Sequence, residues 1–520
     1  MKKRNDPGSK PAKLKKVLSE AEIEKLLDDV DEALFRSDEK RVEDLLGQIP
    51  MDHARIPEII AERLIDGRAQ IPLLAFEMLG TFAGEQTPKY LKRIAEDSGV
   101  ADIVRLGARQ RLGWAERGEA KRRLAFLDTL QDAEATLIET IGQADAMWPA
   151  AIDTFEEALG YLEAMPGKRR QDLLTRAVSE LGVNAAWILK AALHIPDDKT
   201  QRIAMAELIK LRPAGAGAEI DRLTRTGRTK RIRSEAAAAY QRLSLHVVDS
   251  APEEKGQPME VPPVEQVLMS AIDGDGGQVI IVVRRWDEGA YMFADIFHND
   301  HWGIKGAYGT DRAMPEQVAE IVTGLQEEDI GLIEVDLAAA RGAMKMAIDV
   351  NAATGHTLPP NYALWEPLLH NTYPPPAEEP TIVPELDDAP YAGRNDLIRS
   401  SGKLADHEFF ILWPFDPLRT WEAMSKAPPP SGGRLTGKQY KPLIEQLVDP
   451  QMAAILRRRL RRQAWLLDRA GDVVARDLAL AVAAQLAAGR NDELIKQPFL
   501  RTLIERSVDR ALITAHELSQ

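Results

Sequence analysis

The sequence predicts a mainly α-helical protein with a small α+β domain in its middle. Three observations predict this class: apolar residues at helical spacing in the first half, a β-branched run near residue 280, and helical spacing again toward the end. At about 150 residues per domain, a chain of 520 residues is expected to form roughly three domains. We expect an N-terminal α-solenoid (19–248), a central α+β domain (264–371) and a C-terminal helical bundle (397–520).

The composition excludes several classes of protein. A hydrophobic fraction of 44% is ordinary for a globular protein and too high for a generally disordered one. The chain has no cysteine, which excludes disulfides, thiolate metal sites and cysteine nucleophiles. A net charge of −14 argues against a protein that coats nucleic acid over its whole surface, but it is compatible with a local basic patch.

Residues 1–18 are expected to form a basic disordered tail, because they are rich in Lys and include proline and glycine. The tail is either an electrostatic arm for a polyanion or a solvated terminus. No apolar stretch of the kind found in a secretory signal follows it. The longest apolar run, at 478–488, is far short of the roughly 20 residues that span a bilayer. We therefore expect a cytoplasmic protein without a membrane partner.

The first helix is expected to begin after Ser19, because Ser19 and Glu22 have the spacing of a capping box. The Ser hydroxyl can accept a hydrogen bond from the backbone of Glu22, and the Glu carboxylate can reach back. Five apolar residues then follow at helical spacing: Ile23, Leu26, Leu27, Val30 and Leu34.

From about residue 51 to residue 248, a pair of residues recurs in which alanine stands four positions before leucine. The pairs are Ala75 and Leu79, Ala108 and Leu112, Ala177 and Leu181, Ala204 and Leu208, and Ala239 and Leu243. The small alanine lets a neighbouring helix approach closely, and the leucine fills the seam between the two. This pattern resembles the HEAT-like repeat family in a shorter form. The resemblance implies stacked helix pairs with a concave binding surface and rarely chemistry; an irregular helical bundle is the alternative.

A basic segment lies between two expected helices near the end of this region. Its positive side chains are Arg225, Arg228, Lys230, Arg231 and Arg233. Such a cluster can hold phosphates or an acidic partner. The alternative is a charged turn on a solvated face.

The character of the sequence changes after an acidic, proline-rich linker at 249–263. Strands are expected at 278–285, 291–297 and 302–308, followed by helices at 314–325, 337–353 and 361–370. This order predicts an antiparallel sheet with helices on one side.

The candidate chemistry of this domain is concentrated in His298, Asp300 and His301, which are weak candidates for a metal site. Their spacing matches no zinc motif, and a polar turn between two strands is the other interpretation. The sequence also contains no phosphate-binding glycine loop, no nucleophile elbow and no HExxH motif. We therefore name no catalytic residue, no metal and no cofactor.

The C-terminal region follows a proline-rich spacer at 372–396. The most aromatic stretch, 407–416, is either core or an exposed partner site. In the helix expected at 452–467, four arginines share one arc of the surface opposite the apolar face. These four are Arg457, Arg458, Arg461 and Arg462. They either meet an acidic partner or nucleic acid, or pair with nearby carboxylates.

The functional hypothesis is a non-catalytic scaffold or adaptor that binds another macromolecule, a protein above all, through the helical-repeat surface. The second hypothesis is a nucleic-acid-binding protein that uses the tail and the arginine clusters. The third is a hydrolase-type enzyme with its site in the α+β domain.

Overall fold

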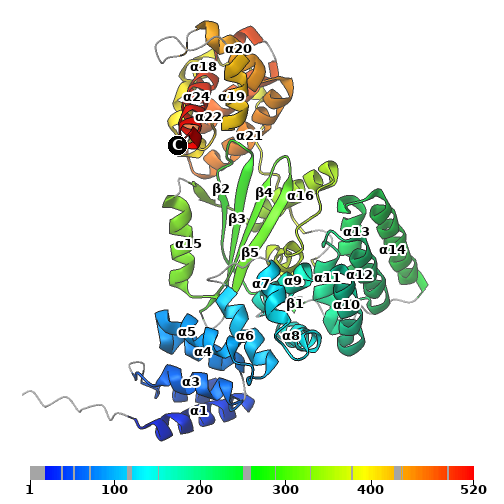
Figure 1. Ribbon diagram of the computed structural model, residues 1–520. Coiled ribbons are helices and arrows are strands. Elements are labelled where there is room, and N and C mark those ends of the chain that lie inside the picture. The colour runs from blue at the N-terminus through cyan, green and yellow to red at the C-terminus, as the bar shows by residue number, and fades with distance from the viewer. Residues whose placement is uncertain are drawn as a thin grey trace, which may run out of the picture. The chain divides into compact units, whose positions relative to one another are not determined.

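The chain is mainly helical with a small antiparallel sheet in its middle (Figure 1). The computed structural model describes residues 18–36, 39–50, 53–69, 72–113, 120–149, 151–249, 259–286, 289–327, 330–375, 379–426, 435, 437–488 and 491–519. Two compact units are present, 1–140 and 141–520, and each is described by itself. Of the basic tail expected at 1–18, only Leu18 lies within the described residues.

The first unit consists of short helices. They are α1 (Glu20–Phe35), α2 (Glu39–Leu46), α3 (Ile56–Ile65), α4 (Pro72–Ala83), α5 (Thr87–Glu96), α6 (Asp102–Gly113), α7 (Ala120–Leu127) and the first part of α8 (Ala133–Met147). The capping box is confirmed, because the Ser19 amide donates to the Glu22 carboxylate over 2.8 Å and the Glu22 amide donates to the Ser19 hydroxyl over 3.3 Å. The side chain of Arg63 on α3 is buried and donates to Asp28 and Asp31 of α1, which joins the two helices.

The second unit begins with further helices. They are the end of α8, α9 (Ile152–Ala164), α10 (Gly167–Leu181), α11 (Ala186–Ala192), α12 (Asp198–Leu211), α13 (Ala216–Thr226) and α14 (Lys230–Asp249). Helix α10 packs against α12, and α12 packs against α14, so every second helix belongs to one row (Figure 1).

The central sheet has five antiparallel strands in the order β5-β4-β3-β2-β6. They are β2 (Val264–Ser270), β3 (Gly277–Arg285), β4 (Tyr291–Asn299), β5 (Gly303–Ala313) and β6 (Leu332–Glu334). A separate pair joins β1 (Met259–Glu260) to β7 (Thr372–Tyr373). The expected strands correspond to β3, β4 and β5, whereas β2 and β6 were not expected from the sequence.

Helices lie against both faces of this sheet, which differs from the expected single face (Figure 1). Side chains alternate along each strand, so β3 and β4 bury apolar residues on both sides. Val318 of α15 (Pro315–Glu327) packs against Ile281 and Phe293 on one face. On the other side, Asn351 of α16 (Leu337–Thr354) accepts a hydrogen bond from the backbone of Ile304. The short α17 (Tyr362–Trp365) follows and contacts β5.

The C-terminal part is again helical. Its helices are α18 (Asn395–Ser400), α19 (Pro417–Lys426), α20 (Gly437–Leu447), α21 (Pro450–Arg469), α22 (Val473–Ala488), α23 (Asn491–Leu494) and α24 (Pro498–Ser519). Phe409, Phe410, Trp413 and Phe415 are buried, and Phe410 and Trp413 pack against Phe499 of α24. These four aromatic residues are therefore core, whereas Ile411 and Leu412 of the same stretch are exposed.

The proline-rich stretch between these parts lies against its neighbours where it is described. The amide of Ile382 donates to the carbonyl of Ala338 on α16, and the amide of Leu386 donates to the carbonyl of Arg461 on α21. A Cβ atom at Gly342 would overlap the carbonyl oxygen of Ile382, so this close crossing requires glycine. Among the described helices, none combines the length and the hydropathy that a bilayer span requires.

Candidate interaction surface

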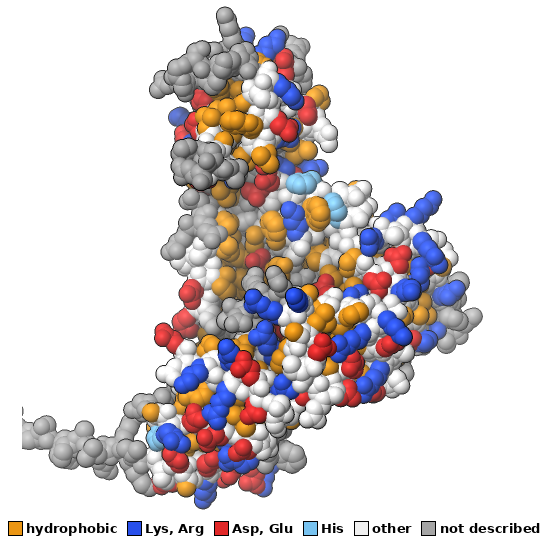
Figure 2. Space-filling model, in the orientation of Figure 1, with side chains coloured by type: hydrophobic (Ala, Val, Ile, Leu, Met, Phe, Trp, Pro, Cys, Tyr) orange, Lys and Arg blue, Asp and Glu red, His pale blue; other side chains and the backbone are white. Residues whose placement is uncertain are grey.

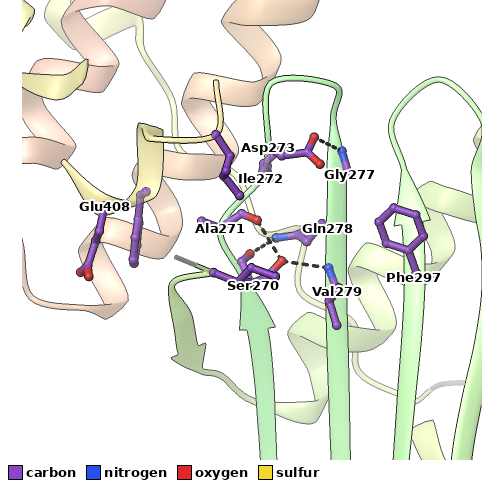
Figure 3. A pocket seen from close by; sticks show the side chains of 12 residues that line it. Ser270, Ala271, Ile272, Asp273, Gly277, Gln278, Val279, Phe297 and Glu408 are labelled. Atoms are coloured by element: carbon purple, nitrogen blue, oxygen red, sulfur yellow. Dashed lines mark hydrogen bonds between the residues drawn. The ribbon is translucent and has the colours of Figure 1, made fainter. Parts of the chain in front are cut away.

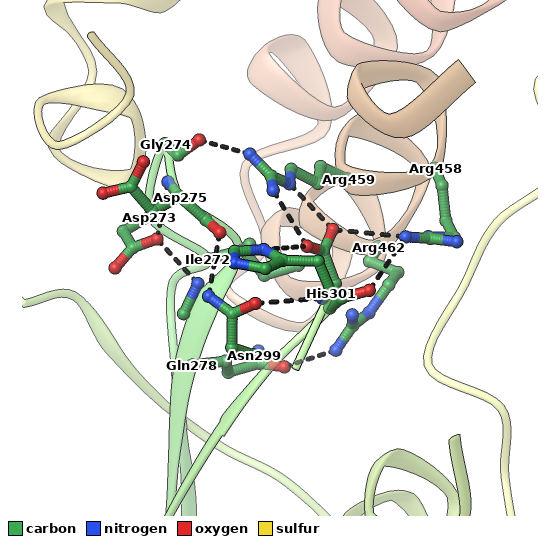
Figure 4. A network of polar contacts seen from close by, with 12 residues as sticks. Ile272, Asp273, Gly274, Asp275, Gln278, Asn299, His301, Arg458, Arg459 and Arg462 are labelled. Atoms are coloured by element: carbon green, nitrogen blue, oxygen red, sulfur yellow. Dashed lines mark hydrogen bonds and ion pairs between the residues drawn. The ribbon is translucent and has the colours of Figure 1, made fainter. Parts of the chain in front are cut away.

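The turn between β4 and β5 brings two groups of candidate residues together, although they are far apart in the sequence. Asp300 in this turn accepts hydrogen bonds from Nε and Nη2 of Arg459 on α21, each 2.8 Å long. The Nη2 of Arg458 lies 3.3 Å from the Asp300 carbonyl oxygen and 3.4 Å from its carboxylate. Figure 4 shows Arg458, Arg459 and Arg462 extending from α21 toward the turns of the sheet. The candidate metal ligands thus lie beside the arginine cluster.

Electrostatics keeps Asp300 ionised and His298 neutral. Burial raises the pKa of Asp300, but the hydrogen bonds and charge of Arg459 outweigh this effect and hold the pKa below its ordinary value. Burial, reinforced by the charge of Arg462, lowers the pKa of His298 to about 3. Burial also lowers the pKa of Arg462 to about 10. The result is an ion-pair junction between the sheet and α21.

The Asp300 carboxylate is occupied by arginine side chains, whereas a metal site needs donor atoms that are free to coordinate the ion. His301 is exposed, and its Nδ1 lies 3.6 Å from the Asp300 carboxylate. The buried Nε2 of His298 has no hydrogen-bond partner. Within the described part of the chain, no group of three or more His, Asp or Glu side chains is placed to hold a metal ion.

The other arginines of α21 also have partners inside the protein. Arg457 donates through Nε to Asp388 over 2.7 Å, and Arg461 lies 2.7 Å from Glu385. Arg462 donates to Gln278 over 2.6 Å. Most of the charge of these arginines already faces acceptors inside the protein. Binding of an external partner by Arg457, Arg458, Arg461 and Arg462 therefore remains a prediction.

A cavity of about 90 Å³ lies at the same end of the sheet, beside the segment Glu408–Phe410. Asp273 borders it and accepts hydrogen bonds from the amides of Asp275 (2.9 Å) and Gly277 (2.6 Å), as Figure 3 shows for Gly277. Burial raises the pKa of this carboxyl group. This volume exceeds the roughly 10–15 Å³ that one water molecule requires, so the cavity can hold water. Typical ligand pockets measure about 300–1,000 Å³, so this one does not support a substrate site.

The basic segment 225–233 has a different environment. Arg225 lies 3.4 Å from Asp349 of α16, and Arg231 lies 2.9 Å from Glu235. Arg228 donates to the carbonyl of Pro196 over 3.0 Å, and Arg233 donates to the carbonyl of Gly227 over 2.8 Å. Lys230 is exposed and forms no ion pair with the described residues. Three of these five cations therefore have no carboxylate partner among the described residues.

The first turns of three helices lie side by side near this segment. Arg170 of α10 lies 3.8 Å from Asp197, which precedes α12. The hydroxyl of Thr229, which precedes α14, donates to Asp198 of α12 over 3.5 Å. Helices α10, α12 and α14 therefore begin at the same end of their row and run in the same direction.

A lysine occupies the start of each helix in this row. Lys168, Lys199 and Lys230 follow one another at intervals of 31 residues. All three are exposed, and none forms an ion pair with a described residue. We call these three lysines with Arg228 and Arg231 the basic rim. Figure 2 shows Lys and Arg side chains gathered over the region of α13 and α14.

The acidic residues near the basic rim are already engaged. Asp197 caps α12 by accepting from the amide of Thr200, and Glu235 accepts from Arg202 over 2.7 Å. Burial raises the pKa of Asp197, but hydrogen bonds from Thr200 outweigh it and lower the pKa. The positive ends of the three helix dipoles add to the charge of the lysines. The rim is therefore a locally positive surface on an acidic protein.

Lys230 was a candidate from the sequence, whereas Lys168 and Lys199 were not. Lys168 begins a run of three basic residues that was not singled out, and Lys199 directly follows two aspartates. The signal that could have found them is the interval of 31 residues, which places all three lysines at equivalent helix starts.

No protein-family model, no curated protein and no solved structure matches this chain.

Proposed function

We propose that the protein is a non-catalytic scaffold that binds an anionic macromolecule along the basic rim. The observation that carries the proposal is the placement of Lys168, Lys199 and Lys230 at the starts of three adjacent parallel helices. These cations are exposed and unpaired among the described residues, in a chain with a net charge of −14. A partner that supplies negative charge along the row relieves their mutual repulsion.

The spacing of the rim suits an extended partner. Packed helices lie about 8–10 Å apart, so the three lysines span roughly 20 Å. A polymer that carries a negative charge every few ångströms can contact all of them at once. Its binding releases counterions and is therefore strongly dependent on salt.

The same interval of 31 residues also relates buried positions in these helices. Leu174, Met205 and Ala236 are buried and stand 31 residues apart. Ala177, Leu208 and Ala239 are buried and follow the same interval. This regularity supports the interpretation of α9–α14 as three stacked helix pairs, the arrangement that the HEAT-like resemblance implies.

A hydrolase-type site in the α+β domain has less support. Asp300 is held by Arg459, and the low pKa of His298 gives it little capacity to accept a proton near neutral pH. The scaffold proposal needs neither group to react.

The experiment compares two charge-reversed proteins with the wild type. The rim variant carries Lys168→Glu, Lys199→Glu and Lys230→Glu. The control variant carries Lys403→Glu, Lys426→Glu and Lys441→Glu, three exposed lysines elsewhere in the same unit. Both variants change the net charge equally, and the control differs otherwise only in that Lys441 forms an exposed ion pair of 3.9 Å with Glu445.

Fluorescence anisotropy then measures binding to three labelled probes: polyglutamate, a single-stranded RNA and a duplex. We expect the wild type and the control variant to bind at least one probe with similar affinity, and the rim variant to bind it at least about tenfold more weakly. The proposal is overturned if no probe binds at low salt, or if the two variants lose affinity equally.

A further inference from the structure

The basic rim continues toward a second exposed group on the same unit. Arg225, three residues before Arg228, contacts Asp349 of α16 at 3.4 Å. Asp349 also pairs with Lys345 at 3.5 Å. Two cations thus face this one carboxylate, so its negative charge does not interrupt the positive surface. Helix α16 ends within two turns of Asp349, at Thr354, and His356 follows. Arg225, which lies three residues before the rim residue Arg228, is thus in direct contact with α16.

An exposed tryptophan lies at the end of α16. Trp302 is 43% exposed, and its ring stacks on His356 with ring centroids 3.6 Å apart. The Nζ of Lys305 lies 5.9 Å from the centre of the Trp302 ring and 5.4 Å from that of Phe297. We call Trp302, His356, Lys305 and Arg458 the tryptophan cluster. In Figure 2, histidine side chains lie beside a hydrophobic one on the face that also carries the Lys and Arg side chains of the helices.

The backbone beneath Trp302 is held rigidly. The buried Asn351 of α16 donates to the carbonyl of Trp302 over 3.2 Å and accepts from the amide of Ile304 over 2.8 Å. Gly303 between them has φ = +91°, and a Cβ atom there would overlap the Asn351 side chain. The indole is therefore presented on a fixed turn, and a partner loses little ordering entropy when it stacks there.

The charge around the indole is positive. Lys305 is exposed and forms no ion pair with the described residues. Arg458 is 43% exposed, and its carboxylate partner, Asp300, also receives two hydrogen bonds from Arg459. One carboxylate thus faces two guanidinium groups, which leaves positive charge near the surface.

We propose that the tryptophan cluster and the basic rim together bind a single-stranded nucleic acid. This inference rests on the proposed function and names the class of its partner. Bases have flat faces that stack on Trp302, while Lys305, Arg458 and the rim contact phosphates. An acidic peptide uses the cations but gains nothing from the indole, and a duplex keeps its base faces covered.

The test uses matched tryptophan variants. Trp302→Ala removes the indole and leaves the backbone bonds to Asn351 in place. Trp302→Phe keeps an aromatic ring. Trp421→Ala is the control, because Trp421 on α19 is 48% exposed and lies outside both the cluster and the rim. Unfolding curves of all variants establish that each is folded, and Lys305→Glu probes the same cluster without altering the indole.

The probes are a single-stranded RNA of about 20 nucleotides, which exceeds the roughly 4–16 nucleotides of single binding domains, an abasic strand of equal length, and polyglutamate. We expect Trp302→Ala to weaken RNA binding about 5- to 100-fold, and Trp302→Phe to restore most of it. The abasic strand should bind Trp302→Ala and the wild type equally. Lys305→Glu should weaken binding of both strands, and Trp421→Ala should weaken neither.

Two results overturn this inference and separate it from the scaffold proposal. If Trp302→Ala binds RNA as tightly as Trp421→Ala does, or weakens RNA and abasic strand equally, bases do not stack on Trp302. If polyglutamate binds the wild type more tightly than the RNA does and the charge-reversed rim abolishes that binding, the partner is an acidic protein and the proposed function stands. If the charge-reversed rim variant binds every probe as tightly as the wild type does, the proposed function fails as well.

Discussion

Asp300 and Arg459 form a buried bidentate ion pair between residues 159 positions apart in the sequence. Arg459 also donates to the carbonyl of Gly274, so one guanidinium group holds two turns at the same end of the sheet. Both side chains are almost fully buried. The pair connects the sheet to α21, and the exposed Arg458 beside it is part of the tryptophan cluster.

Asp300→Asn is expected to lower the free energy of unfolding by about 3–5 kcal/mol, because it leaves the buried charge of Arg459 without its carboxylate. Urea unfolding at neutral pH measures the change. Asp349→Asn is the control, since the pair of Asp349 with Arg225 is exposed and worth less than about 1 kcal/mol. If both variants lose the same free energy of unfolding, the buried pair of Asp300 with Arg459 stabilises the fold no more than an exposed ion pair does.

The stability of the protein is expected to depend on pH through Asp145. Burial raises the pKa of Asp145 to about 7, although the charge of Lys190 partly opposes this effect. The folded state therefore keeps the proton that the unfolded state releases near pH 4, and stability falls as the pH rises from about 4 to 7.

Asp145→Asn removes this titration, so its gain in stability should be greatest above pH 7 and vanish near pH 4. Unfolding free energies at several pH values measure it. Asp172→Asn changes an exposed carboxylate on α10 and serves as the control. A profile of Asp145→Asn that parallels the wild type would refute the assignment.

Two glycines in helices should respond to alanine in opposite directions. A Cβ atom added at Gly324 in α15 would meet no other atom within 4 Å, so Gly324→Ala is expected to stabilise the protein by about 0.5–1 kcal/mol. Gly342 in α16 lies against the backbone of Ile382, so Gly342→Ala should destabilise it despite the better helix propensity. Thermal unfolding of both variants checks the contrast, and a stabilised Gly342→Ala would show that the crossing is loose.

Local features could be predicted from the sequence where a short run of residues carries a clear pattern. The capping box at Ser19 and the β-branched strand at 278–285 each have a local physical cause. The strands β2 and β6 were missed because β2 carries Glu265 and Gln266 within its apolar residues, and β6 is only three residues long.

The partners of charged residues could not be predicted in this way. Arg459 was absent from the predicted site, although it is the most buried partner of Asp300, because the two are joined only by the tertiary fold. The sequence predicted an arc of four arginines on the surface of α21, but Arg462 of this arc is buried. Periodicity alone does not reveal which acids lie opposite the arginines. For the same reason, the sequence gives no indication that Trp302 stacks on His356, which lies 54 residues later.

The salt dependence of RNA binding tests the central claim most directly. If Lys168, Lys199 and Lys230 each contact a phosphate, the charge-reversed rim should reduce the slope of log K against log salt by about 2, at roughly 0.7 per phosphate of a single strand. The control variant at Lys403, Lys426 and Lys441 should keep the slope of the wild type. An unchanged slope in the rim variant would contradict the account.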